Sequence, residues 1–476
     1  MLIEALWIYP PLAFARLGGS DIPLESFAWG EDDTTPHGTG KTTIAPATTF
    51  EVADDSTLSS YLPDNIRFKD AQGFRPVCPF FELHARWSDA QGNKTEGAVT
   101  MQLLAELGLG LAQFAWTVQV ANLKPFNMVK DPATRIGAIV DITGNNHASL
   151  ELQGRAPAGA VNPLVPPDRY IPLGSVRLIK PSHEFPQVRL RFTPAKGIFY
   201  GPTNLKERWK DITLDERFLF LNKDSPWCSW KPTDDDPRGT PGGQYAQDDN
   251  AVSYGMVDDV CDGIIECTLK AGPWTANPAG VLARARIAVA PPDYAPDRRH
   301  LASLADGLKD RVDRAQVYEE SYYADEELCD LEITELLRRI YETAGLNNVD
   351  VFNQRVNVQE NLDTALQLGI PFRPLEFSAF PYPDPLDQRP LPLSDEAREN
   401  HRRLPVLASF LDLIRRQPDL LKQYVREPLD REPFFDHRMP AVMRGPSGAP
   451  LSLSRRQYEF LMRWAALRTA RPEQPP

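Results

Sequence analysis

The sequence has few cysteines, no excess of basic residues and no long apolar run. Its 5 cysteines in 476 residues lack C-x-x-C spacing, which argues against a disulfide scaffold and a zinc site. The formal charge of -13 disfavours nucleic-acid binding, because an acidic surface repels phosphate backbones. The sequence contains no stretch of about 18 consecutive apolar residues, so it predicts no membrane-spanning helix. The opening MLIEALWIYPP lacks the basic region of a signal peptide, so we expect a first strand there and a cytoplasmic protein.

Proline, in contrast, is abundant. The chain has 45 prolines in 476 residues, close to twice the roughly 5% average. Each proline fixes φ and removes a backbone donor, which favours loops and short strands over long helices. The hydrophobic content of 42% and charged content of 25% are otherwise typical of a globular protein long enough for two or three cores.

Apolar and polar residues alternate in short runs over the first 290 residues, the pattern of half-buried antiparallel strands. Three apolar faces stand out: Phe81, Leu83, Ala85 and Trp87; Phe114, Trp116, Val118 and Val120; and Val188, Leu190 and Phe192. Further strands are expected at 136–142, 216–221 and 263–270. We therefore predict an α+β fold with a β-rich, antiparallel, sandwich-like N-terminal body over residues 1–297.

From residue 298 the apolar spacing becomes helical, which predicts a mainly helical C-terminal part over residues 298–476. One helix is expected to present Leu328, Leu331, Leu336, Ile340 and Ala344. A second is expected around 407–414, after a proline-rich connection at 370–393. The segment LSLSRRQYEFLMRWAALR predicts a last helix with Ser452 or Ser454 as its N-cap.

The segment SPWCSW at 225–230 could carry redox chemistry. It brings together Trp227, Cys228 and Trp230. Tryptophan-derived quinones need an oxidisable indole and a second side chain, sometimes a cysteine sulfur, and both types are present here. Tryptophan and cysteine are also common core residues, so a packing role is the alternative.

A second group of candidates is acidic and could hold a metal ion. Its members lie in the long loop 224–262: Asp234, Asp235, Asp248 and Asp258. The string DDVCDG at 258–263 departs from a calcium loop, because Val260 and Leu269 stand where ligands belong. A turn between strands, with Gly263 in a special φ, is the simpler interpretation.

Four segments, in order along the chain, resemble the lysine ε-oxidase and glycine oxidase (LodA-like) family. They are IYPPLAFARLGGSDIP at 8–23; FKDAQGFRPVCPFFELHARW at 68–87; YGMVDDVCDGIIECTLK followed by ARIAVAPPDYAPDRRHLASLADGL; and MPAVMRGPSGAPLSLSRRQYEFLMRWA at 439–465. Members of that family use a cysteine tryptophylquinone built from their own side chains. The resemblance therefore implies the β-rich body of a quinone-dependent amino-acid oxidase.

The family's P-W-Q-A-D-F-x-x-C segment and its quinone tryptophan have no counterpart in this sequence. No residue of this chain can therefore be matched to the family's quinone residues, so no cofactor is expected. The resemblance then favours a non-catalytic partner or scaffold subunit, which would bind a full-length oxidase, a biosynthetic enzyme or itself. Two alternatives stay open: an oxidoreductase with a different Trp/Cys site, and a small-molecule binding or hydrolytic protein that uses the acidic loops.

Overall fold

The structure is a computed structural model that describes residues 1–32, 42–230, 253–293, 302–344 and 453–469, with a few single residues between 417 and 428. The chain divides into two compact units. Unit 1 comprises Met1–Ala28 and Ile44–Tyr294, and unit 2 comprises Trp29–Thr43 and Ala295–Pro476. Within the described ranges, no helix is long and apolar enough to cross a membrane.

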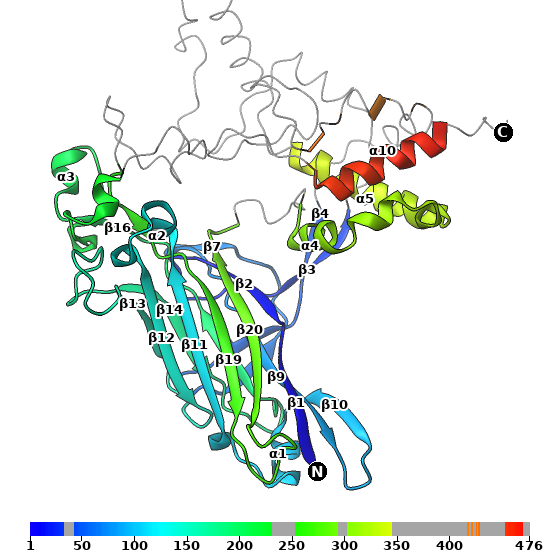
Figure 1. Cartoon of the computed structure of the whole chain (residues 1–476), viewed down its shortest axis with the longest axis horizontal. Helices are drawn as coiled ribbons and strands as arrows, with labels where there is room; N and C mark the ends of the chain where they lie inside the picture. Colours follow the sequence, from blue (N-terminus) through cyan, green and yellow to red (C-terminus); the bar gives the residue numbers. More distant parts are fainter. Residues whose placement is uncertain are drawn as a thin grey trace, which may run out of the picture. The chain divides into compact units, whose positions relative to one another are not determined.

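Unit 1 is β-rich and is built mainly on two sheets (Figure 1). The first sheet has the order β1-β9-β15-β14-β13, with β10 also paired to β9, and all its pairs are antiparallel. Its strands are β1 (Leu2–Tyr9), β9 (Phe80–Ser88), β10 (Lys94–Ala98), β13 (Leu150–Gly154), β14 (Ile171–Leu178) and β15 (Arg189–Thr193). The first strand expected from MLIEALWIYPP is thus confirmed.

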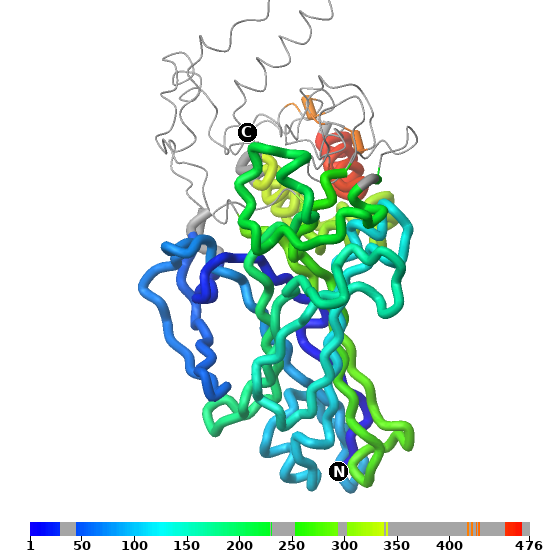
Figure 2. The backbone as a smooth tube through the Cα atoms, turned by 90° about the vertical axis from the view of Figure 1, so that its left-hand side faces the viewer, coloured from blue at the N-terminus to red at the C-terminus, as the bar shows by residue number. Residues whose placement is uncertain are grey.

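The second sheet has five strands in the order β12-β11-β19-β20-β2. They are β2 (Leu12–Arg16), β11 (Phe114–Asn122), β12 (Ile136–Thr143), β19 (Asp262–Leu269) and β20 (Val281–Ala290). Neighbours are antiparallel except β2, which runs parallel to β20. In Figure 2, turned by 90°, the long strands run lengthwise and the N-terminus lies at one end of unit 1.

The inner faces of both sheets meet in one core, around which unit 1 curls as a half-barrel. The predicted apolar faces of β9, β11 and β15 are buried there, and only Trp87 is half-buried. The strands expected at 136–142 and 263–270 are confirmed as β12 and β19. The strand expected at 216–221 is partly wrong: Glu216–Phe218 form a 3-10 turn, capped by the Asp215 side chain, and only Leu219–Leu221 (β17) is extended.

Short elements complete unit 1. Two two-stranded ribbons pair β5 (Thr49–Val52) with β6 (Leu58–Tyr61) and β7 (Lys69–Asp70) with β8 (Gly73–Phe74). A third ribbon pairs β3 (Phe27–Asp32) with β4 (Thr42–Pro46), and its residues 29–32 and 42–43 belong to unit 2. The helices are α1 (Met101–Glu106), α2 (Lys124–Val129) and α3 (Leu205–Arg208). A three-stranded sheet of order β17-β16-β18 adds β16 (Phe199–Pro202) and β18 (Val257–Asp258), and it positions the site described below.

Apart from its residues in β3 and β4, unit 2 is helical where it is described. It contains α4 (Leu304–Val312), 3-10 turns at Arg314–Tyr318 and Glu320–Tyr323, α5 (Glu326–Ala344) and α10 (Arg455–Thr469). The Ser454 side chain accepts a hydrogen bond from the Gln457 N–H at 3.2 Å, which confirms this serine as the N-cap of α10. The helix expected at 407–414 and the connection at 370–393 lie outside the described residues.

The expected helix over 328–344 is confirmed as α5, but part of its predicted apolar face is wrong. Leu328 and Leu331 are 53% and 61% exposed. The buried face contains Cys329, Ile333, Leu336, Leu337 and Ile340. These residues follow the 3.6-residue period from position 329, whereas Leu331 lies about 200° away from Cys329 around the helix.

Candidate functional site

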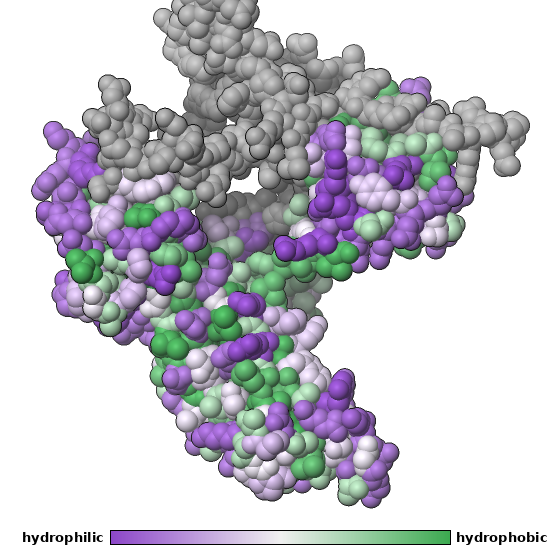
Figure 3. Space-filling view, viewed as in Figure 1, coloured by the Kyte–Doolittle hydropathy of each residue, from purple (hydrophilic) through white to green (hydrophobic). Residues whose placement is uncertain are grey.

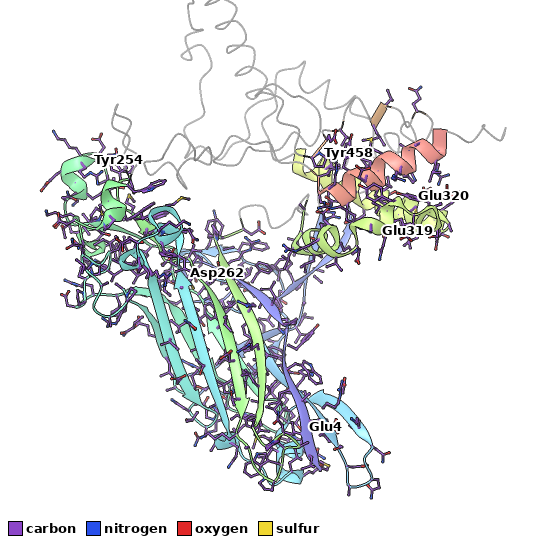
Figure 4. The ribbon with its side chains drawn as sticks, in the orientation of Figure 1. Glu4, Tyr254, Asp262, Glu319, Glu320 and Tyr458 are labelled. Carbon is purple, nitrogen blue, oxygen red and sulfur yellow. The ribbon has the colours of Figure 1, made fainter. Side chains whose placement is uncertain are left out.

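The predicted redox residues lie in unit 1, around the segment 253–262. β18 pairs with β16 through Val257 and Tyr200, and β16 pairs with β17. A 3-10 turn at Pro226–Ser229 follows β17 and carries two of the three residues. Pro226 suits the start of this turn, because its φ is preset and its missing N–H would have had no partner within the turn. Figure 4 shows Tyr254, just before β18, near α3, and Asp262 at the start of β19.

The structure brings Trp227 and Trp230 into contact. Their rings stack with centroids 5.8 Å apart and planes 24° from parallel. The Trp227 indole N–H donates a hydrogen bond to the Met256 carbonyl at 3.1 Å. Trp227 is buried and Trp230 is half-buried. A buried, hydrogen-bonded indole that packs on a second ring is well suited to holding the loop in place.

Cys228 is buried beside this pair. Its thiol donates to the Asn222 carbonyl at 3.3 Å. Burial raises the pKa of the Cys228 thiol to about 12, so the thiol stays protonated at neutral pH and is a poor nucleophile. Trp227 and Cys228 do not fit a tryptophylquinone that a substrate must reach, because both side chains are buried and hydrogen-bonded inside the fold.

Of the acidic candidates, Asp234, Asp235 and Asp248 lie outside the described residues. The Asp258 carboxylate pairs with the Lys124 ammonium at 2.5 Å and accepts a hydrogen bond from the Asn122 amide at 3.1 Å. These contacts tie β18 to the end of β11 and the start of α2. Among the described residues, no three His, Cys, Asp or Glu side chains gather as a metal site would require.

The prediction of a special φ at Gly263 is wrong. Gly263 lies inside β19 and does not have a positive φ. A Cβ atom there would lie 2.4 Å from the Gln119 carbonyl oxygen and 2.6 Å from Val120 Cγ1. Close packing between β19 and β11, and not turn geometry, is what requires a glycine at this position.

Asp259 is the most perturbed carboxyl of this region, and sequence reasoning passed over it. Its side chain is 1% exposed. Oδ2 accepts hydrogen bonds from the N–H groups of Gly197 at 3.1 Å and Ile198 at 2.9 Å, whereas Oδ1 has no partner among the described residues. Burial, with a smaller contribution from Asp258, raises the pKa of Asp259 to about 7. This carboxyl is therefore poised to exchange a proton near neutral pH, inside the fold.

The outer face of the second sheet is a further feature that sequence reasoning missed. We define the outer face by the residues of its five strands that point away from the core: Gly137, Ile139, Asp141 and Thr143 (β12), Ala115, Thr117, Gln119 and Ala121 (β11), Asp262, Ile264, Glu266 and Thr268 (β19), Leu282, Arg284, Arg286, Ala288 and Ala290 (β20), and Leu12, Phe14 and Arg16 (β2).

Apolar side chains are prominent on the outer face. Ile139 is 63% exposed, and Leu282 and Phe14 are exposed as well. In Figure 3 hydrophobic surface gathers over these strands between charged positions. Alternation along each strand signals that one face is solvent-facing, but only the strand order shows that these apolar residues share one surface.

No protein-family model and no curated protein matches this sequence. The chain is similar to solved structures of L-lysine ε-oxidase from Marinomonas mediterranea. The complex with the L-Lys Schiff base intermediate has a TM-score of 0.34 and 16% identity over 65% of this chain and 39% of that chain. A second structure has a TM-score of 0.37 and 16% identity over 71% of this chain and 45% of that chain. This chain thus spans less than half the length of either, and its relationship to that family remains a prediction from the sequence segments.

Proposed function

We propose that this chain is a non-catalytic binding or scaffold subunit, related to the LodA-like oxidases, and that it docks a protein partner on the outer face. The exposed apolar residues of that face, Ile139, Leu282 and Phe14, carry the proposal. An antiparallel sheet with one face in the core usually presents polar residues on the other. Exposed apolar side chains that share one sheet face mark a candidate protein interaction site.

The segment around Trp227 supports a binding role over a catalytic one. Its indole, the Cys228 thiol and the Asp258 carboxylate are all engaged in contacts that hold unit 1 together. From the family resemblance, the candidate partners are a full-length oxidase, a biosynthetic enzyme or a second copy of the chain. In each case this chain would contribute a rigid docking surface and not a reactive group.

Native purification of the tagged chain from its own cells, followed by cross-linking and mass spectrometry, tests the proposal. We expect a stoichiometric partner, which is either another protein or the chain itself, cross-linked next to β12 or β20. Ile139→Asp should release it, and Val161→Asp should not. Val161 is 80% exposed in a loop outside the outer face, so it is a matched control. Equal retention by both variants, or a chain that stays alone, would sink the proposal.

The alternative function is an oxidoreductase with a Trp/Cys-derived cofactor. The stacking of Trp227 on Trp230 beside Cys228 is the observation in its favour. Intact-mass and visible absorption measurements on the purified chain decide this point. A mass that shows loss of hydrogens and gain of oxygens, together with visible absorbance, would support the oxidoreductase. We expect an unmodified mass, which would exclude a Trp/Cys-derived cofactor.

A further inference from the structure

We infer that the partner on the outer face is a second copy of this chain, packed sheet to sheet about a two-fold axis that runs parallel to the strands. The inference rests on the proposed function and names the partner of the same surface. It is carried by how charge is distributed across the five strands.

Charge is segregated on the outer face by strand. The acidic half, on β12, β11 and β19, carries Asp141, Asp262 and Glu266 and no basic residue. The basic half, on β20 and β2, carries Arg284, Arg286 and Arg16 and no acidic residue. Because β19 and β20 are neighbours, the boundary passes between them, and there the Arg284 guanidinium pairs with the Glu266 carboxylate at 2.5 Å.

Of the two packings that keep the strands of both copies aligned, only one makes such a surface complementary to itself. A two-fold axis parallel to the strands reverses their order, so β12 of one copy lies towards β2 of the other, and each acidic half faces a basic half. A two-fold axis across the strands would instead place acidic on acidic. Like charges across an interface cost several kcal/mol, roughly, so the electrostatics favour the first arrangement.

Charges without an ion pair remain on each half. Arg286 and Asp262 form no ion pair among the described residues, and Asp141 accepts a hydrogen bond from Thr117 without a cationic partner. In contrast, Arg16 is already paired with Asp293 at 3.4 Å. In this arrangement Arg286 of one copy faces the acidic half of the other copy, where Asp141 has no cationic partner among the described residues, and we take these two residues as the pair to test.

The rest of the face suits close packing of two sheets. Register places Ile139, Gln119, Ile264, Arg286 and Leu12 in one row across all five strands. Small residues at the neighbouring positions, including Gly137, Ala121 and Ala288, allow sheets to approach to about 10 Å.

Five strands about 4.8 Å apart and about eight residues long cover roughly 600 Å² of flat area. That is near the lower end of stable interfaces, which bury about 800 Å² per partner. We therefore expect a reversible dimer and not a permanent one.

Sedimentation velocity over a concentration series tests the dimer, with circular dichroism to show that each variant is folded. The wild type and Val161→Asp should dimerise reversibly, and more weakly at high salt. Ile139→Asp should stay monomeric. Arg286→Glu and Asp141→Arg should each weaken dimerisation by about tenfold or more. A mixture of these two variants should form a heterodimer, because the reversed charges then face each other.

A wild type that stays monomeric at every concentration, or a mixture that does not recover, would overturn the inference. The proposed function would still stand if a different protein were cross-linked to the outer face and lost from Ile139→Asp. The proposed function would be overturned together with the dimer only if the outer face bound neither a second copy nor a different protein. The two outcomes are therefore distinguishable.

Discussion

A Cβ atom on Gly255 would lie 2.4 Å from Sγ of Cys228, so these two residues pack together only because one of them is glycine. Gly255 also has a φ of +77°, in the left-handed region that side chains disfavour. The segment that leads into β18 and the turn that carries Trp227 therefore constrain each other's position.

We expect Gly255→Ala to destabilise unit 1 by about 2–4 kcal/mol, as the sum of a backbone cost of about 1 kcal/mol and overpacking of about 1–3 kcal/mol. Urea unfolding followed by tryptophan fluorescence measures the change. Gly159→Ala is the matched control, because Gly159 has a φ of +75° but no atom within 4 Å of the added Cβ. Equal losses in the two variants would show that the contact with Cys228 imposes no constraint.

Asp259 should make stability depend on pH. Its folded-state pKa is about 7, above the value of about 4 expected when unfolded. Between these values the folded state holds a proton that the unfolded state has lost, so this group lowers stability as pH rises from about 4 to 7, by on the order of 4 kcal/mol in total. The full penalty is present above pH 7.

We therefore expect Asp259→Asn, which resembles the protonated carboxyl, to flatten this dependence and to be more stable than the wild type at pH 8. Denaturant midpoints at pH 5.5 and pH 8 provide the measurement. Asp258→Asn should not behave in this way, because it breaks the ion pair with Lys124. Parallel pH profiles for the wild type and Asp259→Asn would contradict the assignment.

Burial should protect most of the thiols from alkylation. Burial raises the pKa of Cys228, Cys261 and Cys267, and all three side chains lie in the core of unit 1. We expect iodoacetamide at pH 7.5 to label them slowly in the native protein and rapidly in urea, with half-buried Cys78 the fastest of the native thiols. Peptide mapping after timed labelling measures the rates. Rapid native labelling of Cys228 would contradict a packing role.

In unit 2, the Asp330 carboxylate joins α5 to α10. It accepts hydrogen bonds from the Trp464 indole at 2.9 Å and the Arg468 guanidinium at 2.6 Å. Asp330→Ala leaves the buried indole N–H without this acceptor, which should cost about 1–3 kcal/mol and increase hydrogen exchange throughout α10. Exposed Glu319 (Figure 4) provides the control, since Glu319→Ala should leave exchange in α10 unchanged.

Sequence alone determined the local features whose causes lie within a few residues. Alternation identified the buried faces of β9, β11 and β15, because side chains in a strand point to opposite sides in turn. The Ser454 cap was predictable because it bonds to a residue three positions away. Trp227 and Trp230 were expected together because they are close in the chain.

Only the tertiary structure decided the features that depend on distant partners. Asp258 and Asp259 are adjacent in sequence, but Lys124 pairs with one while the backbone at 197–198 encloses the other. Leu331 follows a helical period and is nevertheless exposed, because packing selected the face around Ile333. Likewise, Asp141 and Arg286 share one surface through strand order alone, since hydrogen-bonded strands become neighbours whatever their separation along the chain.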